Sequence, residues 1–165
     1  MSSAWSLPMN QLHLRPFNRH AYAILSSWFQ DLELRRRVCP PTEQWYEYVH
    51  GPQCRAWMVF ENRKAVGHVA VDIEADHTAH LLFLVKPALH GQGYGKRILR
   101  ALIEAAPGEG IHRLRASVEA DNLASIACLL AVGFQAVRVQ PDNEGFLHFC
   151  YEIHLNRPSD EMKGS

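Results

Sequence analysis

The sequence predicts an α/β protein with a mixed, mostly antiparallel central sheet that is flanked by about four helices. Three observations lead to this prediction. The spacing of apolar residues changes repeatedly between the alternation typical of strands and the period typical of helices. Residues 81–85 form a continuous apolar run, as in a strand that is covered on both faces. A loop with three glycines then separates this run from an amphipathic helix.

The first part of the chain is predicted to form one strand and two helices. Residues 12–16 alternate between leucine and polar side chains, which favours a strand. Apolar residues recur at helical spacing over residues 19–34, and a Pro-Pro pair ends the pattern. Thr42 is a suitable N-cap for a second helix, which ends at Gly51.

The middle of the chain is predicted to form three strands and one helix. Residues 57–60 and 66–73 are extended segments joined by a polar turn, so they form a hairpin. The apolar run at residues 81–85 is then the central strand. After the glycine-rich loop, residues 96–106 place apolar side chains on one face of a helix and charged side chains on the other.

The last part is predicted to form a strand, a helix and a final hairpin. Residues 114–118 alternate as a strand, and residues 123–131 have apolar side chains at helical spacing. Gly133 closes that helix. Residues 136–139 and 146–155 flank a Pro-Asp-Asn-Glu-Gly turn, which indicates two antiparallel strands.

Length and charge limit the domain organisation and the partners. The chain has 165 residues, and a single-core domain commonly has about 100–200. We expect a flexible leader at residues 1–10, one domain over residues 11–156 and a polar tail over residues 157–165. The 17 basic residues balance the 17 acidic ones, which gives no general electrostatic reason to expect nucleic acid as a partner.

Apolar runs and cysteines limit the compartment. No segment approaches the roughly 20 apolar residues of a membrane span, so no membrane partner is expected. The four cysteines show neither CxxC pairing nor the spacing of a disulfide framework or zinc knuckle. An HxxH pattern at His77 and His80 lacks helical context and a second ligand cluster. We therefore expect reduced thiols, no bound metal and a cytoplasmic location.

The strongest chemical signal is the loop that contains Gly91, Gly93 and Gly95. Glycine lets the backbone approach a phosphate closely, and the N-terminus of the following helix favours an anion. The loop is not a P-loop, because Arg97 follows Lys96 where Ser or Thr is required. Its glycine spacing also differs from the Rossmann fingerprint. The alternative is a tight strand-to-helix turn without a ligand.

In these residues the sequence resembles the GNAT superfamily of N-acetyltransferases. The family signature is Arg or Gln, two residues, Gly, one residue, and Gly or Ala. Residues 90–95 match it, except that His90 replaces Arg or Gln. Residues 122–126, followed by Gly133, are similar to the fourth-helix segment of the family. The resemblance spans about residues 11–156 and implies an acyl-CoA N-acyltransferase fold with acetyl-CoA as cosubstrate.

The resemblance also implies a set of CoA-binding residues. The residues expected along the pantetheine arm are Phe83, Leu84 and Val85; those expected around the pyrophosphate are His90, Gly91, Gln92, Gly93, Tyr94, Gly95 and Lys96; and those expected on the CoA arm are Asn122 and Ser125. The alternative for Asn122 is a helix N-cap, a role that is compatible with CoA contact. Tyr94 is expected to pack against CoA or the next helix.

The expected catalytic residues depart from the family pattern. Transfer to an amine needs a neutral nucleophile and a stabilised leaving thiolate. Relatives that resemble this chain place a Tyr acid where it has Leu129, and ribosomal-protein acetyltransferases place a Glu where it has Ser117. The substitutes that we assign are Glu74, His80 and Tyr151, with Asp72 and His148 as further titratable groups. Alternatively, transfer depends mainly on holding the amine beside the thioester.

The resemblance is nearest to the branch that includes aminoglycoside 6'- and ribosomal-protein N-acetyltransferases. It implies transfer of an acetyl group from acetyl-CoA to a primary amine by direct attack in a ternary complex, in a monomer or homodimer. We favour a small-molecule amine over the alternatives, a protein or peptide amine or a non-catalytic acyl-CoA-binding module. The residues expected to receive a cationic amine, or else to pack as core, are Trp28, Asp31, Trp45, Tyr46 and Tyr48.

Overall fold

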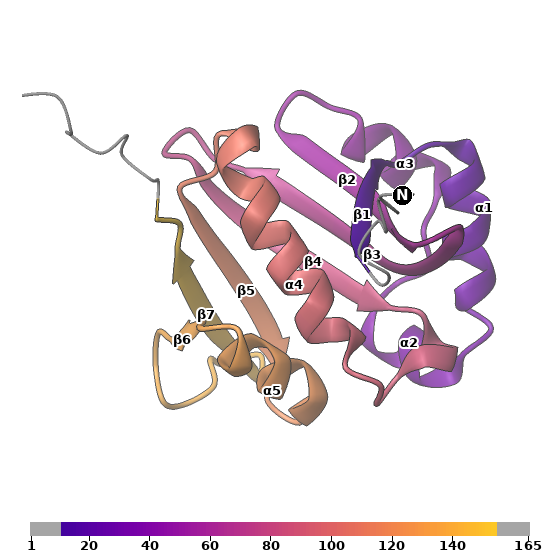
Figure 1. Ribbon diagram of the computed structural model, residues 1–165. Helices are drawn as coiled ribbons and strands as arrows, with labels where there is room; N and C mark the ends of the chain where they lie inside the picture. The colour runs from indigo at the N-terminus through magenta and orange to yellow at the C-terminus, as the bar shows by residue number, and fades with distance from the viewer. Residues whose placement is uncertain (1–10, 155–165) are drawn as a thin grey trace, which may run out of the picture.

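The computed structural model describes residues 11–154 and forms a mixed sheet between two groups of helices (Figure 1). The predicted leader at residues 1–10, the predicted tail at residues 157–165 and the last residue of the predicted strand 146–155 lie outside this part of the chain. No helix within the described residues is long and apolar enough to cross a membrane.

The order of elements agrees with the predicted order apart from one additional helix. The strands are β1 (Leu12–Pro16), β2 (Cys54–Glu61), β3 (Lys64–Ile73), β4 (Thr78–Val85), β5 (Arg113–Glu119), β6 (Gln135–Ala136) and β7 (Phe146–Glu152). The helices are α1 (Arg19–Trp28), α2 (Leu32–Arg37), α3 (Glu43–Val49), α4 (Tyr94–Ala105) and α5 (Leu123–Ala131), with short 3-10 turns η1 (Pro87–Leu89) and η2 (Ala106–Glu109).

The strands form one sheet in the order β1-β2-β3-β4-β5-β7-β6. All neighbouring pairs are antiparallel except β4 and β5, which are parallel. The predicted mixed, mostly antiparallel sheet is therefore confirmed. So is the central place of the apolar run at residues 81–85, which belongs to the fourth of the seven strands. Helices cover both faces of this strand, which explains why it carries no polar alternation.

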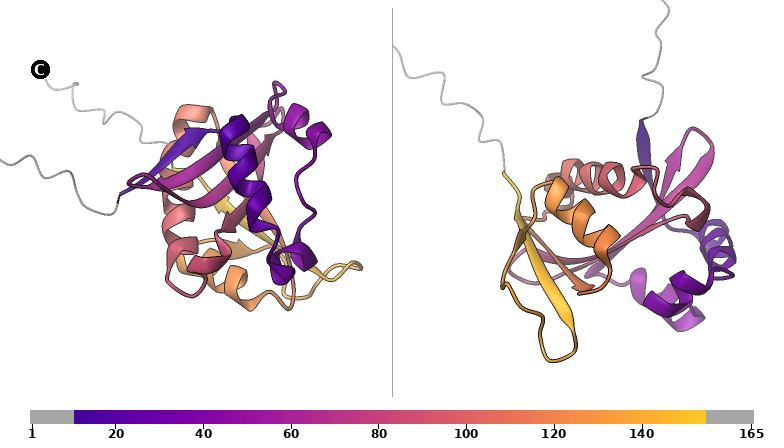
Figure 2. Two further views of the ribbon diagram at one scale, coloured as in Figure 1. Left: turned by 90° about the vertical axis from the view of Figure 1, so that its right-hand side faces the viewer. Right: turned by 90° about the horizontal axis from the view of Figure 1, so that it is seen from below.

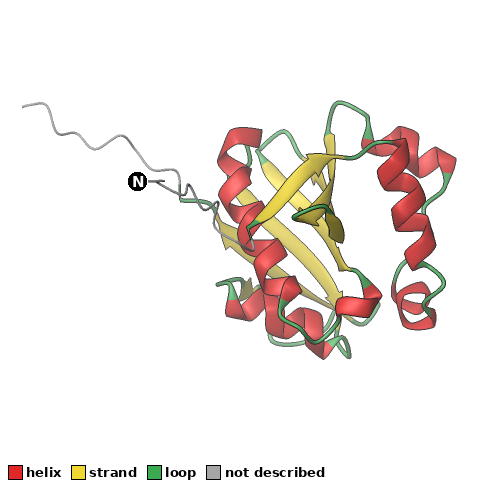
Figure 3. Cartoon of the chain, turned by 45° about the vertical axis from the view of Figure 1, so that its right-hand side comes forward, coloured by secondary structure: helices red, strands yellow, loops and turns green. Residues whose placement is uncertain are grey.

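The helices cover opposite faces of the sheet. Leu99 and Leu102 of α4 are fully buried in a core that includes Leu129 of α5 and the side chains of one sheet face. Leu25 of α1 and Val49 of α3 pack with the other face in a second core. Figure 2 (right) shows α4 and α5 on one side of the sheet and α1, α2 and α3 on the other, and Figure 3 shows the strands between them.

The single helix predicted over residues 19–34 is wrong, because the chain forms two helices there. The first ends at Trp28, and the Asp31 carboxylate accepts a hydrogen bond from the Leu34 N–H at 2.9 Å. An aspartate at an N-cap starts a new helix by satisfying a free N–H group, and this local bond overrides the continuing apolar period. The predicted N-cap Thr42 is confirmed by its bond to the Trp45 N–H.

The predicted strand at residues 136–139 is shorter than expected. Only Gln135 and Ala136 pair with β7, and the chain leaves the sheet after a last backbone bond from the Val137 N–H to the His148 carbonyl at 2.8 Å. Val137 and Val139 are 53% and 96% exposed, so their side chains gain nothing from a strand at this edge. The segment after β6 instead forms a loop over residues 137–145, which extends on the side of the sheet where α1–α3 lie (Figure 2, right).

Candidate active site

The centre of the sheet is open on one side of β4. The parallel pairing of β4 with β5 covers only three residue pairs, from Thr78 with Arg113 to His80 with Arg115. Figure 1 shows the two strands starting side by side and then diverging. Beyond His80, β4 remains paired with β3 alone, and β5 remains paired with β7. Residues 81–85 therefore offer backbone donors and acceptors to an extended ligand, as an edge strand does.

A cleft of about 670 Å³ follows this opening through the sheet. This volume is within the ~300–1,000 Å³ typical of small-molecule sites. The cleft is lined by the diverging parts of β4 and β5, the glycine-rich loop and the first turns of α4 and α5 on one side, and α2 on the other. It therefore connects the two faces of the sheet.

The glycine-rich loop supplies one end of the cleft. Gly91 and Gly93 have φ values of 77° and 84°, in the left-handed region, and a Cβ at either would meet nothing within 4 Å. These glycines are therefore needed for backbone conformation and leave an open surface. The other α-helices within residues 11–154 each have a side-chain N-cap, whereas α4 begins after Gly93 with none. Its N–H groups face the cleft end without a capping side chain.

Gly95 serves a different purpose from the two loop glycines. It is buried in the first turn of α4, and an added Cβ would lie 2.7 Å from Cys128 Sγ in α5. Such an approach is shorter than real Cβ atoms show, so Gly95 allows the two helices to pack closely. The third glycine of the motif thus sets the position of the helix N-terminus rather than the shape of the loop.

The polar side chains around the loop have partners of their own. His90 donates its Nε2–H to the Val85 carbonyl at 3.1 Å. Tyr94 donates its hydroxyl to Glu61 at 2.7 Å, and Arg97 also pairs with Glu61. These bonds from Tyr94 and Arg97 lower the pKa of Glu61, and the same bond raises the pKa of Tyr94. The hydroxyl of Tyr94 is therefore bonded to β2, and Tyr94 also lines the cleft.

The CoA-binding residues expected from the sequence come together in this cleft. All of them line it except Gln92, whose side-chain amide lies 3.4 Å from the Ala88 carbonyl. Asn122 is also the N-cap of α5, since its carboxamide oxygen lies 3.4 Å from the Ser125 N–H. Both interpretations of Asn122 are therefore compatible with its position.

The part of the cleft formed by α2 and the end of β5 is rich in carboxylates. Glu33 from α2 and Glu119 and Asp121 from the end of β5 line it together with Arg37. Arg37 binds all three, at 3.1 Å to Glu33 and 3.2 Å to Glu119, and most closely to Asp121. The bond to Asp121 raises the pKa of Arg37, and Arg37 lowers the pKa of Asp121. These ion pairs join α2 to β5 across the cleft.

A hydrogen-bonded chain also reaches this part of the cleft. Ser117 lines the cleft, and its Oγ lies 2.8 Å from His148 Nδ1. His148 Nε2 lies 2.7 Å from Asp142 Oδ2. The sequence analysis considered Ser117 and His148 separately and missed both the bond between them and the part played by Asp142. The signal that could have revealed the bond is the antiparallel register of β5 and β7, which pairs Ser117 with His148.

The three assigned catalytic residues do not line the cleft. His80 and Glu74 bond to each other at 2.9 Å, where β4 and β5 are still paired. The Tyr151 ring packs against Phe134, on the sheet face that α4 and α5 cover. Leu129, at the position of the usual acid, is fully buried. The catalytic assignment of Glu74, His80 and Tyr151 stays a prediction.

The aromatic residues expected to bind the acceptor are occupied by packing or hydrogen bonds. Trp28 is buried, Trp45 and Tyr46 contact the ring of Phe17, and Tyr48 donates its hydroxyl to Asp72 at 2.8 Å. Asp31 caps α2. None of these side chains lines the cleft, and in their place α2 contributes Glu33 and Arg37. Among the described residues, no group of three or more His, Cys, Asp or Glu side chains could hold a metal ion.

The chain belongs to the acetyltransferase (GNAT) family, whose model matches residues 19–134. It is therefore an acetyl-CoA-dependent N-acetyltransferase, as the resemblance implied. A curated relative, the uncharacterized N-acetyltransferase YfmK of Bacillus subtilis (strain 168), is 30% identical over 127 residues, which cover 75% of this chain and 85% of the relative.

Solved structures share the fold at low sequence identity. The spermidine N-acetyltransferase of Vibrio cholerae in complex with CoA and spermine has a TM-score of 0.76 and 14% identity, covering 87% of this chain and 96% of its own. The aminoglycoside acetyltransferase AAC(6')-Ib in complex with coenzyme A has a TM-score of 0.74 and 16% identity, and the match covers 86% of this chain and 95% of that one. The ribosomal-protein-S18-alanine N-acetyltransferase of Escherichia coli has a TM-score of 0.68 and 19% identity, and the match covers 90% of this chain and 98% of that one.

Proposed function

We propose that this enzyme acetylates a primary amine of a small cationic molecule by direct attack on acetyl-CoA in a ternary complex. The observation that carries the proposal is the cleft where β4 and β5 diverge, which is lined by the glycine-rich loop and by a carboxylate-rich part of α2 and β5. The two substrates would enter from opposite faces and meet where β4 and β5 diverge. The proposal treats residues 11–156 as one catalytic unit.

The charges along the cleft support this arrangement. The loop end carries Lys96 and the uncapped N-terminus of α4, which together favour the pyrophosphate of CoA. On the α2 side, Glu33, Glu119 and Asp121 line the cleft with Arg37, and Arg36 also pairs with Glu33 and Asp121. The carboxylates exceed the guanidiniums by one, and this excess negative charge favours an ammonium group. The spermidine N-acetyltransferase of Vibrio cholerae has the same fold and was solved in complex with spermine, a small cationic amine.

The CoA-binding role of the lining residues belongs to the same proposal. The backbone of Phe83, Leu84 and Val85 would bond to the pantetheine arm along the open side of β4. The loop from His90 to Lys96 would bind the pyrophosphate, and Asn122 with Ser125 would contact the arm from α5. The residue with the weakest support in this set is Gln92, which does not line the cleft.

Direct attack needs no covalent enzyme intermediate. The amine nitrogen forms a bond to the thioester carbon, the carbon–sulfur bond breaks, and CoA leaves. Holding the two substrates side by side contributes several kcal/mol by itself. A cytoplasmic location is part of the proposal, because the four cysteines are unpaired and the cytoplasm keeps thiols reduced.

The acceptor class is tested by measuring release of the CoA thiol with a panel of a polyamine, an aminoglycoside and peptides that carry free N-termini or lysines. We expect turnover with the small amines and initial velocities whose double-reciprocal lines intersect, as in a ternary complex. Activity on peptides alone would move the function to protein acetylation. CoA binding without turnover on any amine would instead indicate a non-catalytic module.

Gly93→Ala is expected to weaken CoA binding about tenfold, which corresponds to about 1.4 kcal/mol. The methyl group would stand on the open surface where phosphate approaches, at a φ of 84°. The left-handed backbone would also cost about 1 kcal/mol of stability. Calorimetric titration with CoA and urea unfolding measure the two effects separately.

Gly110→Ala is the matched control for Gly93→Ala. Gly110 also has a positive φ, 72°, and open space around its Cβ, but it follows η2 and does not line the cleft. Its alanine variant should lose similar stability and bind CoA as the unmodified protein does. Equal CoA affinity in both variants would contradict the assignment of the loop to the pyrophosphate.

A further inference from the structure

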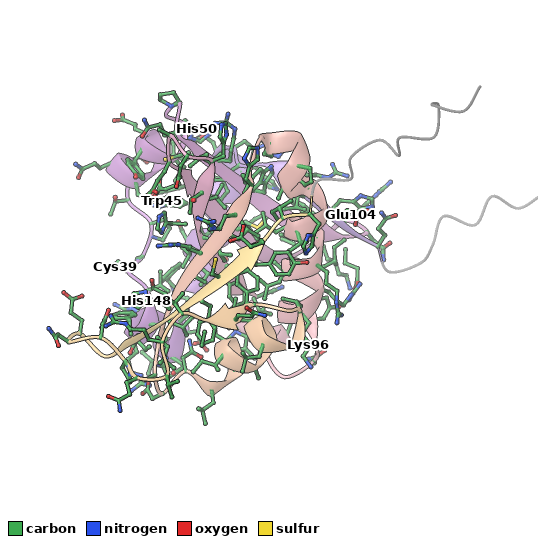
Figure 4. All side chains as sticks on the ribbon, turned by 90° about the vertical axis from the view of Figure 1, so that its left-hand side faces the viewer. Cys39, Trp45, His50, Lys96, Glu104 and His148 are labelled. Atoms are coloured by element: carbon green, nitrogen blue, oxygen red, sulfur yellow. The ribbon has the colours of Figure 1, made fainter. Side chains whose placement is uncertain are left out.

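Ser117, His148 and Asp142 form a connected chain from the cleft into the last hairpin. Ser117 lies on β5, on the side of the sheet facing α1–α3, and the β5–β7 register places His148 directly opposite. Figure 4 shows His148 on the same side of the sheet as Cys39 and Trp45, and Lys96 on the other. Only Ser117 of the three lines the cleft, so the histidine reaches it through the serine hydroxyl.

The turn before β7 fixes the state of Asp142. Its Oδ1 accepts the backbone N–H groups of Glu144 and Phe146, both at 2.9 Å, and its Oδ2 faces His148 Nε2. The bonds from the Phe146 N–H and from His148 lower the pKa of Asp142, so its carboxylate is ionised near neutral pH. Gly145, with a φ of 88°, allows the tight turn that gathers these donors.

An ionised Asp142 sets the tautomer of the imidazole. A carboxylate only accepts hydrogen bonds, so His148 donates Nε2–H to it and leaves the lone pair on Nδ1. The Ser117 hydroxyl then donates to Nδ1, and its oxygen lone pairs are turned to other partners. A serine in this arrangement accepts a proton as it gives up its own.

We propose that Ser117, His148 and Asp142 are the proton relay of the acetyl transfer, with Ser117 as the group that touches the attacking amine. The proposal rests on the proposed function. The relay would act as the base that some related enzymes provide with a glutamate at the position of Ser117. Asp142 and His148 are positioning and proton-accepting partners that act through Ser117.

The proton balance of the relay is simple. As the neutral amine bonds to the thioester carbon, its surplus proton passes to Ser117 Oγ, and the serine proton passes to His148 Nδ1. The resulting imidazolium is stabilised by the Asp142 carboxylate. When the carbon–sulfur bond breaks, the same proton returns through Ser117 to the thiolate, and CoA leaves as the thiol. No group other than the two substrates is consumed.

The relay predicts a specific pH dependence. The pH profile of the activity should depend on the presence of His148, because only a neutral imidazole can accept the proton. The charged and titratable groups that neighbour the relay are Arg115 and Glu119 on β5, Cys150 on β7, Asp142 and Glu144 in the turn, and Arg37 of α2, which binds Glu119.

His148→Gln is expected to lower kcat about 100-fold, at the lower end of the contribution of general base catalysis. KM for acetyl-CoA should stay the same, and the pH profile of kcat should change. Asp142→Asn should lower kcat by a smaller factor and should also change its pH profile. Ser117→Ala should lower kcat as much as His148→Gln does. His13→Gln, an exposed strand histidine on the opposite edge of the sheet, should keep kcat and its pH profile.

Two further measurements decide the proposal without dependence on the acceptor. Nitrogen NMR of the labelled imidazole should report the Nε2–H tautomer for His148, and Asp142→Asn should alter it; an Nδ1–H tautomer in the unmodified protein would overturn the relay. Mass spectrometry after incubation with acetyl-CoA alone should find no acetyl group on Ser117. A stable acetyl-Ser117 would show a covalent mechanism in place of the relay.

The outcomes separate this inference from the proposed function. If the unmodified protein acetylates no amine, the proposed function and the relay both fail. If it is active and folded His148→Gln keeps its kcat and pH profile, the relay alone fails. Circular dichroism of each variant establishes that it is folded, and the NMR measurement on the unmodified protein stands even if a variant unfolds.

Discussion

Gly95→Ala is expected to destabilise the protein by about 1–3 kcal/mol, the usual cost of inserting a methyl group into packed structure. The new Cβ would lie 2.7 Å from Cys128 Sγ, so α4 and α5 must separate at this point. The N-terminus of α4, which forms the loop end of the cleft, would move with them. CoA binding should weaken along with stability, and urea unfolding with calorimetric titration measures both.

Cys128→Ala tests the cause of this effect. It removes the Sγ that clashes, and the remaining Cys128 Cβ would lie 3.6 Å from the new methyl group, an ordinary contact. The double variant should therefore be more stable than the sum of the single changes predicts. Gly108→Ala, in open space with no positive φ, should change neither property. Additive losses in the double variant would contradict a direct clash between the helices.

Lowering the pH from about 6.5 to about 4 is expected to cost about 3 kcal/mol of unfolding free energy through His68 alone. This side chain is fully buried, and burial lowers its pKa to about 4. In the unfolded chain the imidazole takes up a proton near pH 6.5, whereas the folded protein resists protonation until about pH 4. Between these values the unfolded state binds more protons, so stability is complete above pH 6.5 and falls with acidification.

His68→Leu isolates this contribution. The variant loses the bond from Nδ1 to the Trp57 carbonyl, at 3.0 Å, but it also removes the buried Nε2, which has no hydrogen-bond partner. We expect its unfolding free energy, measured by urea titration at several pH values, to fall less between about pH 6.5 and about pH 4 than that of the unmodified protein. The difference between the two falls should be about 3 kcal/mol. His20→Gln, an exposed histidine, is the control and should follow the unmodified protein. If the unfolding free energies of His68→Leu and of the unmodified protein changed with pH in parallel, the neutral state of the buried His68 ring would be contradicted.

The fold could be predicted because its elements leave local signals. Alternating apolar residues, a continuous apolar run and glycine or proline at the boundaries identified the strands and most helices. The break between α1 and α2 escaped because the apolar spacing continues past Asp31, whose capping bond is a single local contact. The extent of β6 escaped because exposed valines have a strand-like pattern but no neighbouring surface to pack against.

The glycine-rich loop and the relay differ in how far the sequence could predict them. The glycine-rich loop follows its strand and precedes its helix directly, so adjacent residues define it. The relay joins Ser117 to His148, 31 residues away, and depends on the register of two strands that the sequence does not specify. Glu74 and His80 are close in sequence and do form a pair, but where β4 and β5 are still joined.

With CoA bound as proposed, the short junction between β4 and β5 would also make the cosubstrate part of the stability of the protein. Only three residue pairs join the two halves of the sheet there, and a ligand bound along residues 81–85 adds cross-links that the polypeptide does not provide. By thermodynamic linkage, CoA at about a hundred times its Kd would add about 2.7 kcal/mol to the unfolding free energy. The concentration of acetyl-CoA would then affect the stability of the enzyme as well as its rate.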